Sequence, residues 1–183
     1  LVANYYRLDG LTGIVSNDQH VFEENISLGD PSLLKMYGFE ASSGDVHTAL
    51  SSPTSMVIDE RAAIKYFGQT DVVGRRLSIR NFAGENRDFE ITAVLKKATQ
   101  NSVMEFMPSM QTSIFLPLSS EAYFGRQVDS WSNLWVVGFL ALQAGVRPEQ
   151  LQQPIKQLPR PHPALPLADN LTPNLPPFAP SHP

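Results

Sequence analysis

Short hydrophobic segments alternate with polar turns along most of the chain. Residues 20–28 set Val, Phe and Ile in a polar background, which predicts a first strand, and the apolar run 54–58 predicts a buried one. Apolar and polar residues alternate over 76–80 and 89–95, so these segments predict two strands joined by a turn at 82–86. The pattern therefore indicates a sheet of short strands.

One helix has clear signals at both ends. Asp59 is placed as the N-cap of a helix over 60–67, because an aspartate oxygen accepts hydrogen bonds from free backbone amides. Gly68 follows as the residue that ends it. Helical spacing puts Phe67 on one face with Ala63 and Ile64, which predicts that Phe67 is buried.

The remaining elements follow from the same signals. The predicted elements are a helix over 32–37 between Asp30-Pro31 and Gly38, a strand over 114–118, a helical turn from 119 to 125, a central strand over 134–142 and a helix over 148–158. Strands and helices are mixed at irregular spacing. We therefore predict the α+β class and not a doubly wound parallel sheet.

Proline separates the end of the chain from the rest. Nine of the 15 prolines lie in residues 158–183, which carry only Arg160 and Asp169 as full charges. Because proline lacks a backbone N–H and fixes φ, this segment predicts an extended strap or a disordered end.

Composition excludes several classes of protein. The net charge is −4, from 14 basic and 18 acidic residues, so charge-driven binding of nucleic acid is not expected. The chain has no cysteine, which excludes disulfides, thiolate zinc sites and a cysteine nucleophile. The longest strongly apolar run, 134–142, is well short of the roughly 20 residues of a membrane-spanning helix. Because the chain starts at Leu1, we interpret it as a fragment or a processed chain.

Motifs for catalysis are weak throughout. In the segment 68–76, five residues separate the two glycines where a phosphate loop needs four, so a helix stop and a turn explain it better. Glu23 and Glu24 point to opposite faces of a strand, and Asp59-Glu60 fits a helix start. No two histidines have metal-ligand spacing; they are His20, His47, His162 and His182. We therefore predict no catalytic, cofactor-binding or metal-binding residues and no enzymatic activity.

One segment is a candidate for contacts with a partner. Residues 103–110 hold three of the five methionines beside Phe106. Flexible thioethers next to an aromatic ring can form an adaptable apolar contact surface. The alternative is a loop that folds over the core.

The order of three segments resembles a known family. They are DPSLLKMYGFEASSGD (30–45), ALSSPTSMVIDERAAIKYFGQTDVVGRRLSI (49–79) and FEITAVLKKATQNS (89–102). Together they look like the periplasmic core domain of MacB-like and FtsX-like ABC transporter permeases, with the variants of Bacteroidetes most similar. The resemblance covers 21–158, and block 58–77 is its most specific part. The sequence departs from the family at Ala93, where glycine is more usual.

The resemblance implies an organisation and a role. The implied parts are a membrane-proximal lead-in (1–20), a porter-like subdomain of βαβ units (21–44 and 131–158), an inserted β-rich, sabre-like subdomain (45–130) and a proline-rich tail that leads back toward the membrane (159–183). The domain would lie in the periplasm, tethered to the inner membrane in the full-length protein.

The implied function is non-catalytic. A cognate ABC ATPase would drive the permease, and this domain would relay that movement to a periplasmic protein, lipoprotein or peptide substrate. The alternative from another class is a free-standing periplasmic or secreted binding module.

Overall fold

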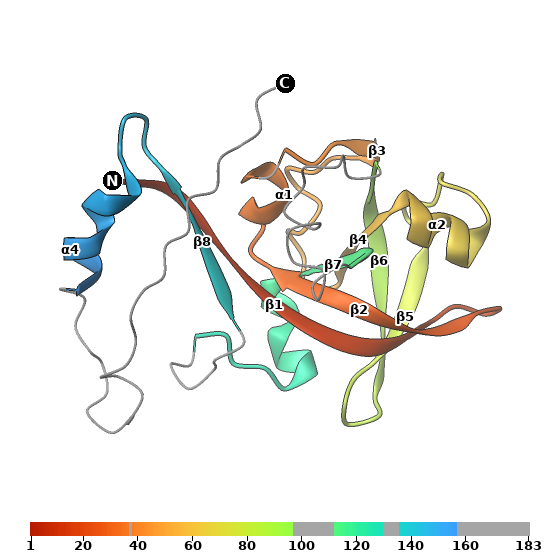
Figure 1. The fold of residues 1–183 in the computed structure, drawn as a ribbon. Helices are drawn as coiled ribbons and strands as arrows, with labels where there is room; N and C mark the ends of the chain where they lie inside the picture. The colour runs from red at the N-terminus through yellow and green to blue at the C-terminus, as the bar shows by residue number, and fades with distance from the viewer. Residues whose placement is uncertain (37, 97–111, 130–135, 157–183) are drawn as a thin grey trace. The chain divides into compact units, whose positions relative to one another are not determined.

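The computed structural model describes residues 1–36, 38–96, 112–129 and 136–156. In chain order the elements are β1 (Val2–Ser16), β2 (Val21–Gly29), α1 (Ser32–Met36), β3 (Ala41–Gly44), β4 (Ser55–Asp59), α2 (Glu60–Phe67), β5 (Arg76–Arg80), β6 (Asn86–Leu95), β7 (Ile114–Pro117), the 3-10 helix η2 (Leu118–Phe124), β8 (Val137–Leu142), η3 (Pro148–Leu151) and α4 (Gln152–Lys156). Strands and short helices are mixed, which confirms the α+β class (Figure 1).

Six strands close into a ring. Neighbouring strands in the hydrogen-bonded order are β2, β7, β4, β6, β5 and β1, and β1 also pairs with β2. The β2–β7 and β4–β6 pairs are parallel, and the other pairs of the ring are antiparallel. Outside the ring, β3 adds to β6 and β8 follows β1. A closed ring leaves its strands few free edges.

The strand β1 was not predicted, so residues 20–28 are not the first strand. Residues 8–16 of β1 pair with 21–29 of β2, and its last three residues also pair with β5. The sequence hides this strand because Arg7, Asp9 and Gly10 interrupt its apolar positions. Pairing on both edges supplies the stability that the local pattern lacks.

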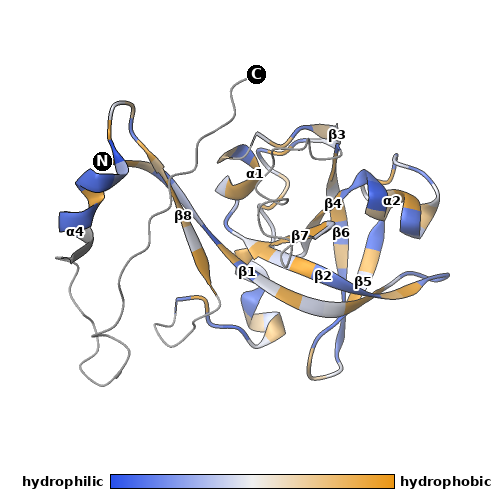
Figure 2. Ribbon diagram, viewed as in Figure 1, coloured by the Kyte–Doolittle hydropathy of each residue, from blue (hydrophilic) through white to orange (hydrophobic). Residues whose placement is uncertain are grey.

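Two clusters of buried side chains lie on opposite faces of the central strands. Within β4, Met56 and Ile58 belong to the cluster that includes α2, whereas Val57 belongs to the cluster that includes α1. Every residue of β4 and β7 is buried for this reason. In Figure 2, orange is concentrated on the strands and α4 is mostly blue. Burial on both faces explains why residues 54–58 read as a continuous apolar run.

Both ends of α2 are confirmed, but its buried face is not. Asp59 Oδ1 accepts a hydrogen bond from the Ala62 amide at 2.9 Å, and Gly68 ends the helix with φ 71°. The core is filled by Tyr66, while Ile64 is 56% exposed and Phe67 is only partly buried. The prediction that Phe67 is buried is therefore met only in part.

The rotation of α2 has a physical reason. The Tyr66 hydroxyl donates to Glu24 Oε1 at 2.9 Å, so the ring can be buried while its polar end is satisfied. Burial, the largest cause, and the bond to Glu24 raise the pKa of Tyr66. Phe67 packs at the margin of this core, with the Arg75 guanidinium 5.0 Å from its ring centroid.

The predicted central strand over 134–142 is an edge strand. The structure has β8 at 137–142, last in the strand order, and none of its residues is fully buried. Among the described residues β8 has one strand neighbour, β1, which is consistent with its half-buried and exposed residues. The other predicted elements are confirmed to within a few residues over the described ranges.

The chain divides into two compact units. One is Tyr5–Phe139, which contains the strand ring, and the other combines Leu1–Asn4 with Leu140–Pro183. Within the smaller unit, the Gln143 amide donates to the Leu1 carbonyl at 2.9 Å. The predicted porter-like part 21–44 lies in the same unit as 45–130, and β2 pairs with β7 across that boundary. The subdomain assignment itself stays a prediction.

Two further points concern the membrane. Within the ranges that the structure describes, no helix has the length and apolar character to cross a bilayer. The proline-rich tail 159–183 lies outside the described residues, so the prediction of a strap stays open.

Candidate functional site

The weak catalytic motifs have structural roles. Gly74 forms a turn with φ 86°, and its amide donates to the Ile91 carbonyl at 2.8 Å. The segment 68–76 is therefore the turn between α2 and β5. Glu24 accepts from Lys65 Nζ at 2.7 Å, whereas Glu23 is exposed on the other face of β2.

The described histidines do not form a site. The His20 ring stacks on Phe22 with centroids 6.0 Å apart, and the His47 amide donates to Asp45. In the described ranges no three metal-ligating side chains come together. His162 and His182 lie outside the described residues, as does the methionine-rich segment 103–110.

The feature that stands out is an exposed aromatic ring at the tip of the β5–β6 hairpin. Phe82 is 67% exposed. Asn81 holds the turn from both sides: its Oδ1 accepts from the Glu85 amide at 2.9 Å, and its Nδ2 donates to the Tyr123 carbonyl at 2.9 Å. The turn is thus tied to η2, so the ring is held outward on a fixed support.

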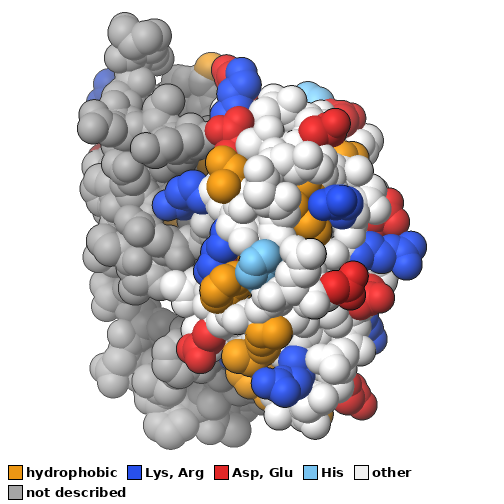
Figure 3. Space-filling model, turned by 90° about the vertical axis from the view of Figure 1, so that its right-hand side faces the viewer, with side chains coloured by type: hydrophobic (Ala, Val, Ile, Leu, Met, Phe, Trp, Pro, Cys, Tyr) orange, Lys and Arg blue, Asp and Glu red, His pale blue; other side chains and the backbone are white. Residues whose placement is uncertain are grey.

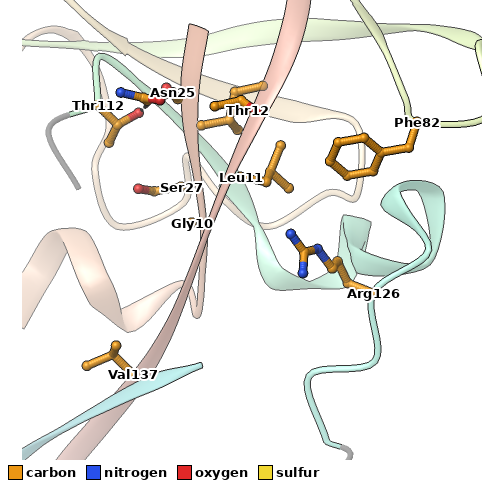
Figure 4. A pocket seen from close by; sticks show the side chains of 10 residues that line it. Gly10, Leu11, Thr12, Asn25, Ser27, Phe82, Thr112, Arg126 and Val137 are labelled. Carbon is orange, nitrogen blue, oxygen red and sulfur yellow. Dashed lines mark hydrogen bonds between the residues drawn. The ribbon is translucent and has the colours of Figure 1, made fainter. Parts of the chain in front are cut away.

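Phe82 lies between two hollows. One of about 530 Å³ is bordered by β1, β2, Phe82 and Arg126, and one of about 510 Å³ lies between the hairpin tip and η2. Figure 4 shows the Phe82 ring and the Arg126 guanidinium together beside β1, with Thr12, Asn25 and Ser27 along the strands. We call this region the Phe82 surface: Thr12, Phe82, Arg87, Ser119 and Arg126.

A buried carboxylate lies behind Arg126. Asp9 is fully buried, since strand alternation places it on the same face of β1 as the core residues Leu11 and Val15. Its Oδ2 is 3.8 Å from Arg126 Nε, beyond hydrogen-bond distance. Within the part of the chain that the structure describes, neither Asp9 oxygen nor Arg126 Nε has a hydrogen-bond partner.

The electrostatics of this pair follow from burial. Burial raises the pKa of Asp9, because the charged carboxylate loses its hydration; Arg126 opposes the rise and Glu121 adds to it. The Arg126 guanidinium is 5.9 Å from the Phe82 ring, and the Arg126 amide donates to the Glu121 carbonyl at 3.0 Å. Arg126 is thus a cation at the border of a hollow with a counter-charge behind it.

This arrangement suits recognition. A guanidinium donates to carboxylates in a fixed planar geometry, and an adjacent aromatic ring offers an apolar contact. Sequence reasoning identified residues 82–86 only as a turn and did not place Asp9 or Arg126 at all. The available signal was a large aromatic residue in an otherwise polar turn.

Comparison with known proteins decides the family. A family model for the MacB-like periplasmic core domain matches residues 2–158. The chain belongs to this family. A MacB-like periplasmic core domain is the non-catalytic, periplasmic or extracellular domain of an ABC transporter permease. The family assignment and the predicted absence of enzymatic activity are therefore confirmed, and the alternative of a free-standing binding module is set aside.

Solved structures share this fold. A domain assigned to a permease protein of Porphyromonas gingivalis is 26% identical, with a TM-score of 0.67 over 85% of this chain and 62% of that one. The periplasmic region of MacB from Actinobacillus actinomycetemcomitans is 15% identical, with a TM-score of 0.60 over 86% and 67%. The extracellular domain of the transporter YknZ from Gram-positive bacteria is 14% identical, with a TM-score of 0.57 over 83% and 70%.

This MacB-like chain spans 62% of the length of the Porphyromonas domain. No curated protein matches it.

Proposed function

We propose that this MacB-like domain relays an ATP-driven movement of its permease to a substrate or partner outside the cytoplasm. The observation that carries the proposal is β1, a single strand that begins at Val2 in the smaller unit and ends at Ser16 in the strand ring. A displacement applied near Leu1 passes along one hydrogen-bonded element.

The strand ring supports the role of a rigid receiver. Nine residue pairs join β1 to β2, and three join it to β5. Arg7 adds a fork-shaped ion pair, because its Nε and Nη2 each lie 3.0 Å from an oxygen of Asp30, next to the end of β2. Interiors packed at crystal-like density transmit strain, so the ring moves as one body when β1 moves.

Membership of the family supports the partners that we propose. A cognate ABC ATPase would supply the movement through membrane and cytoplasmic parts outside this chain. A periplasmic protein, lipoprotein or peptide would receive it, with no nucleic acid involved. We retain the porter-like and sabre-like division as part of this proposal, with the strand ring as the part that receives the movement.

An insertion between the two units tests the relay. In the full-length permease with its ATPase, Gly-Ser-Gly inserted between Asn4 and Tyr5 would interrupt β1 where it passes from one unit to the other. Flexible glycine-rich linkers transmit little force. We expect ATP hydrolysis to continue while export, or the response of the partner, is lost.

The matched control is the same insertion between Asp18 and Gln19, in the turn that follows β1. That insertion should leave coupling intact. Export that survives the Asn4–Tyr5 insertion, with the domain still folded by circular dichroism, would contradict the relay.

A further inference from the structure

We infer that the Phe82 surface is a docking site for an acidic segment of another polypeptide, one that carries an aliphatic or aromatic side chain beside its carboxylates. This deepens the proposed function, on which it rests, by naming where a partner binds and its chemistry.

Exposure identifies the anchor. Phe82 has the largest exposed fraction of the exposed large hydrophobic residues in the described ranges, ahead of Val21 at 64% and Ile64 at 56%. Phe82 alone of these three lines the two hollows. An aromatic residue with adjoining hollows can be enclosed by a partner, and enclosed aromatic residues dominate the binding energy of interfaces.

Charge identifies the partner. Arg87 and Arg126 line the hollows on either side of Phe82, against one carboxylate, Glu85. Glu85 Oε2 already accepts a hydrogen bond from Asn81 Nδ2 at 3.1 Å. The charged side chains that line the two hollows are thus two guanidiniums and one carboxylate, while Asp9 is buried behind Arg126 and does not line either hollow. Over the face that Figure 3 shows, basic and acidic side chains are interspersed. Complementary charge favours an acidic segment.

Asp9 positions the side chain of Arg126 for binding a carboxylate. The buried carboxylate lies 3.8 Å behind Nε and holds the positive charge at the border of the hollow. An incoming carboxylate would meet an arginine whose side chain is 25% exposed, where hydrogen bonds to charge are stronger than in open water.

Rigidity lowers the cost of binding. The Tyr123 hydroxyl lies 2.6 Å from the carbonyls of both Ile79 and Glu85, so η2 is joined to β5 and to the turn of the hairpin. Arg87 lies 4.1 Å from the centroid of the Tyr123 ring. A surface ordered before binding loses little conformational entropy when the partner arrives.

The test uses the full chain and two fluorescent peptides. One repeats Leu-Glu-Ser-Glu and the other repeats Leu-Lys-Ser-Lys, and binding is followed by anisotropy at low and physiological salt. We expect the acidic peptide to bind at least about tenfold more tightly than the basic one, and added salt to weaken it. Equal affinity for the two peptides, or binding of neither, overturns the inference.

Variants place the binding on this surface. Phe82→Ala should weaken the acidic peptide by about tenfold or more, whereas Ile64→Ala, at a similarly exposed residue, should change it by less than about twofold. Equal loss in both overturns the inference.

A variant in which both charges of the Asp9–Arg126 pair are removed keeps the test valid if Arg126→Gln alone does not fold. Arg126→Gln alone leaves Asp9 without a counter-charge, so Asp9→Asn/Arg126→Gln is the second variant. It should fold and still lose most of its preference for the acidic peptide; a preserved preference overturns the role of Arg126. These measurements need no ATPase. If the peptides do not bind as expected, the proposed relay is not affected. If the insertion test fails, the result of the peptide-binding test still holds.

Discussion

The β5–β6 hairpin places two phenylalanines in opposite environments. Phe89 in β6 is completely buried, with its ring centroid 5.9 Å from that of Tyr123 and 6.3 Å from that of Phe124. Phe82, at the tip, is 67% exposed. The same residue type therefore serves the core at one end of the hairpin and an open surface at the other.

The difference separates stability from recognition. Burying a large apolar side chain stabilises the folded state by about 1.5–3 kcal/mol. Phe89 is completely buried, so it contributes the whole of this stabilisation. Phe82 has gained only part of that amount. The remainder is available when a partner covers the ring, which is the physical basis of the proposed docking.

The largest effect is expected in the body of the hairpin. Phe89→Ala should lower the free energy of unfolding by about 3–5 kcal/mol, because it opens a cavity next to two aromatic rings. Chemical denaturation of the full chain measures this. A loss below about 1 kcal/mol would mean that the ring is not part of a packed core.

A second large effect is expected where β3 approaches β6. Gly44 has φ 81°, and a Cβ there would lie 2.3 Å from the Thr92 carbonyl oxygen. Gly44→Ala should therefore cost more than about 2 kcal/mol, from backbone strain and a clash with main chain.

The matched control is Gly84→Ala in the hairpin turn. Gly84 has φ 86° but nothing within 4 Å of the added methyl group, so only the backbone penalty of about 1 kcal/mol remains. Equal losses at the two positions would show that the β3–β6 approach is not tight.

A smaller effect of opposite sign is expected at Asp9. The pKa of Asp9 is raised in the folded state, so the folded chain binds this proton more tightly than the unfolded chain does. The neutral carboxyl group therefore stabilises the fold at low pH, and this stabilisation is lost as the pH rises through the raised pKa. Asp9→Asn removes the buried charge and should stabilise the chain by about 1 kcal/mol at pH 7.

The pH dependence distinguishes this mechanism. The advantage of Asp9→Asn should shrink as the pH is lowered toward the ordinary aspartate pKa of about 3.9, since the wild-type carboxyl is then neutral too. Urea titrations at several pH values would reveal it. Destabilisation by Asp9→Asn at pH 7 would indicate that the pair with Arg126 outweighs the cost of burial.

The smallest effect is expected at the tip. Phe82→Ala should change the free energy of unfolding by no more than about 0.5 kcal/mol, as for most exposed positions. Thermal unfolding beside Phe89→Ala completes the comparison. A loss at the tip comparable to that at Phe89 would place Phe82 in the fold and not in recognition.

Local signals determined much of this protein. The start of α2 at Asp59, its end at Gly68, the bounds of β5 and the buried strand β4 were all predictable, because caps, glycines and apolar runs act within a few residues. The order of segments was specific enough to indicate the family.

Tertiary structure decided what depends on distant residues. β1 exists as a strand because β2 and β5 pair with it. The helix α2 buries Tyr66 because Glu24 accepts a hydrogen bond from the hydroxyl of this residue. Asp9, Phe82 and Arg126 meet only once the ring closes and η2 is fastened to the hairpin. No local pattern encodes such a meeting, since each partner lies dozens of residues from the next and only pairing across the sheet brings them together.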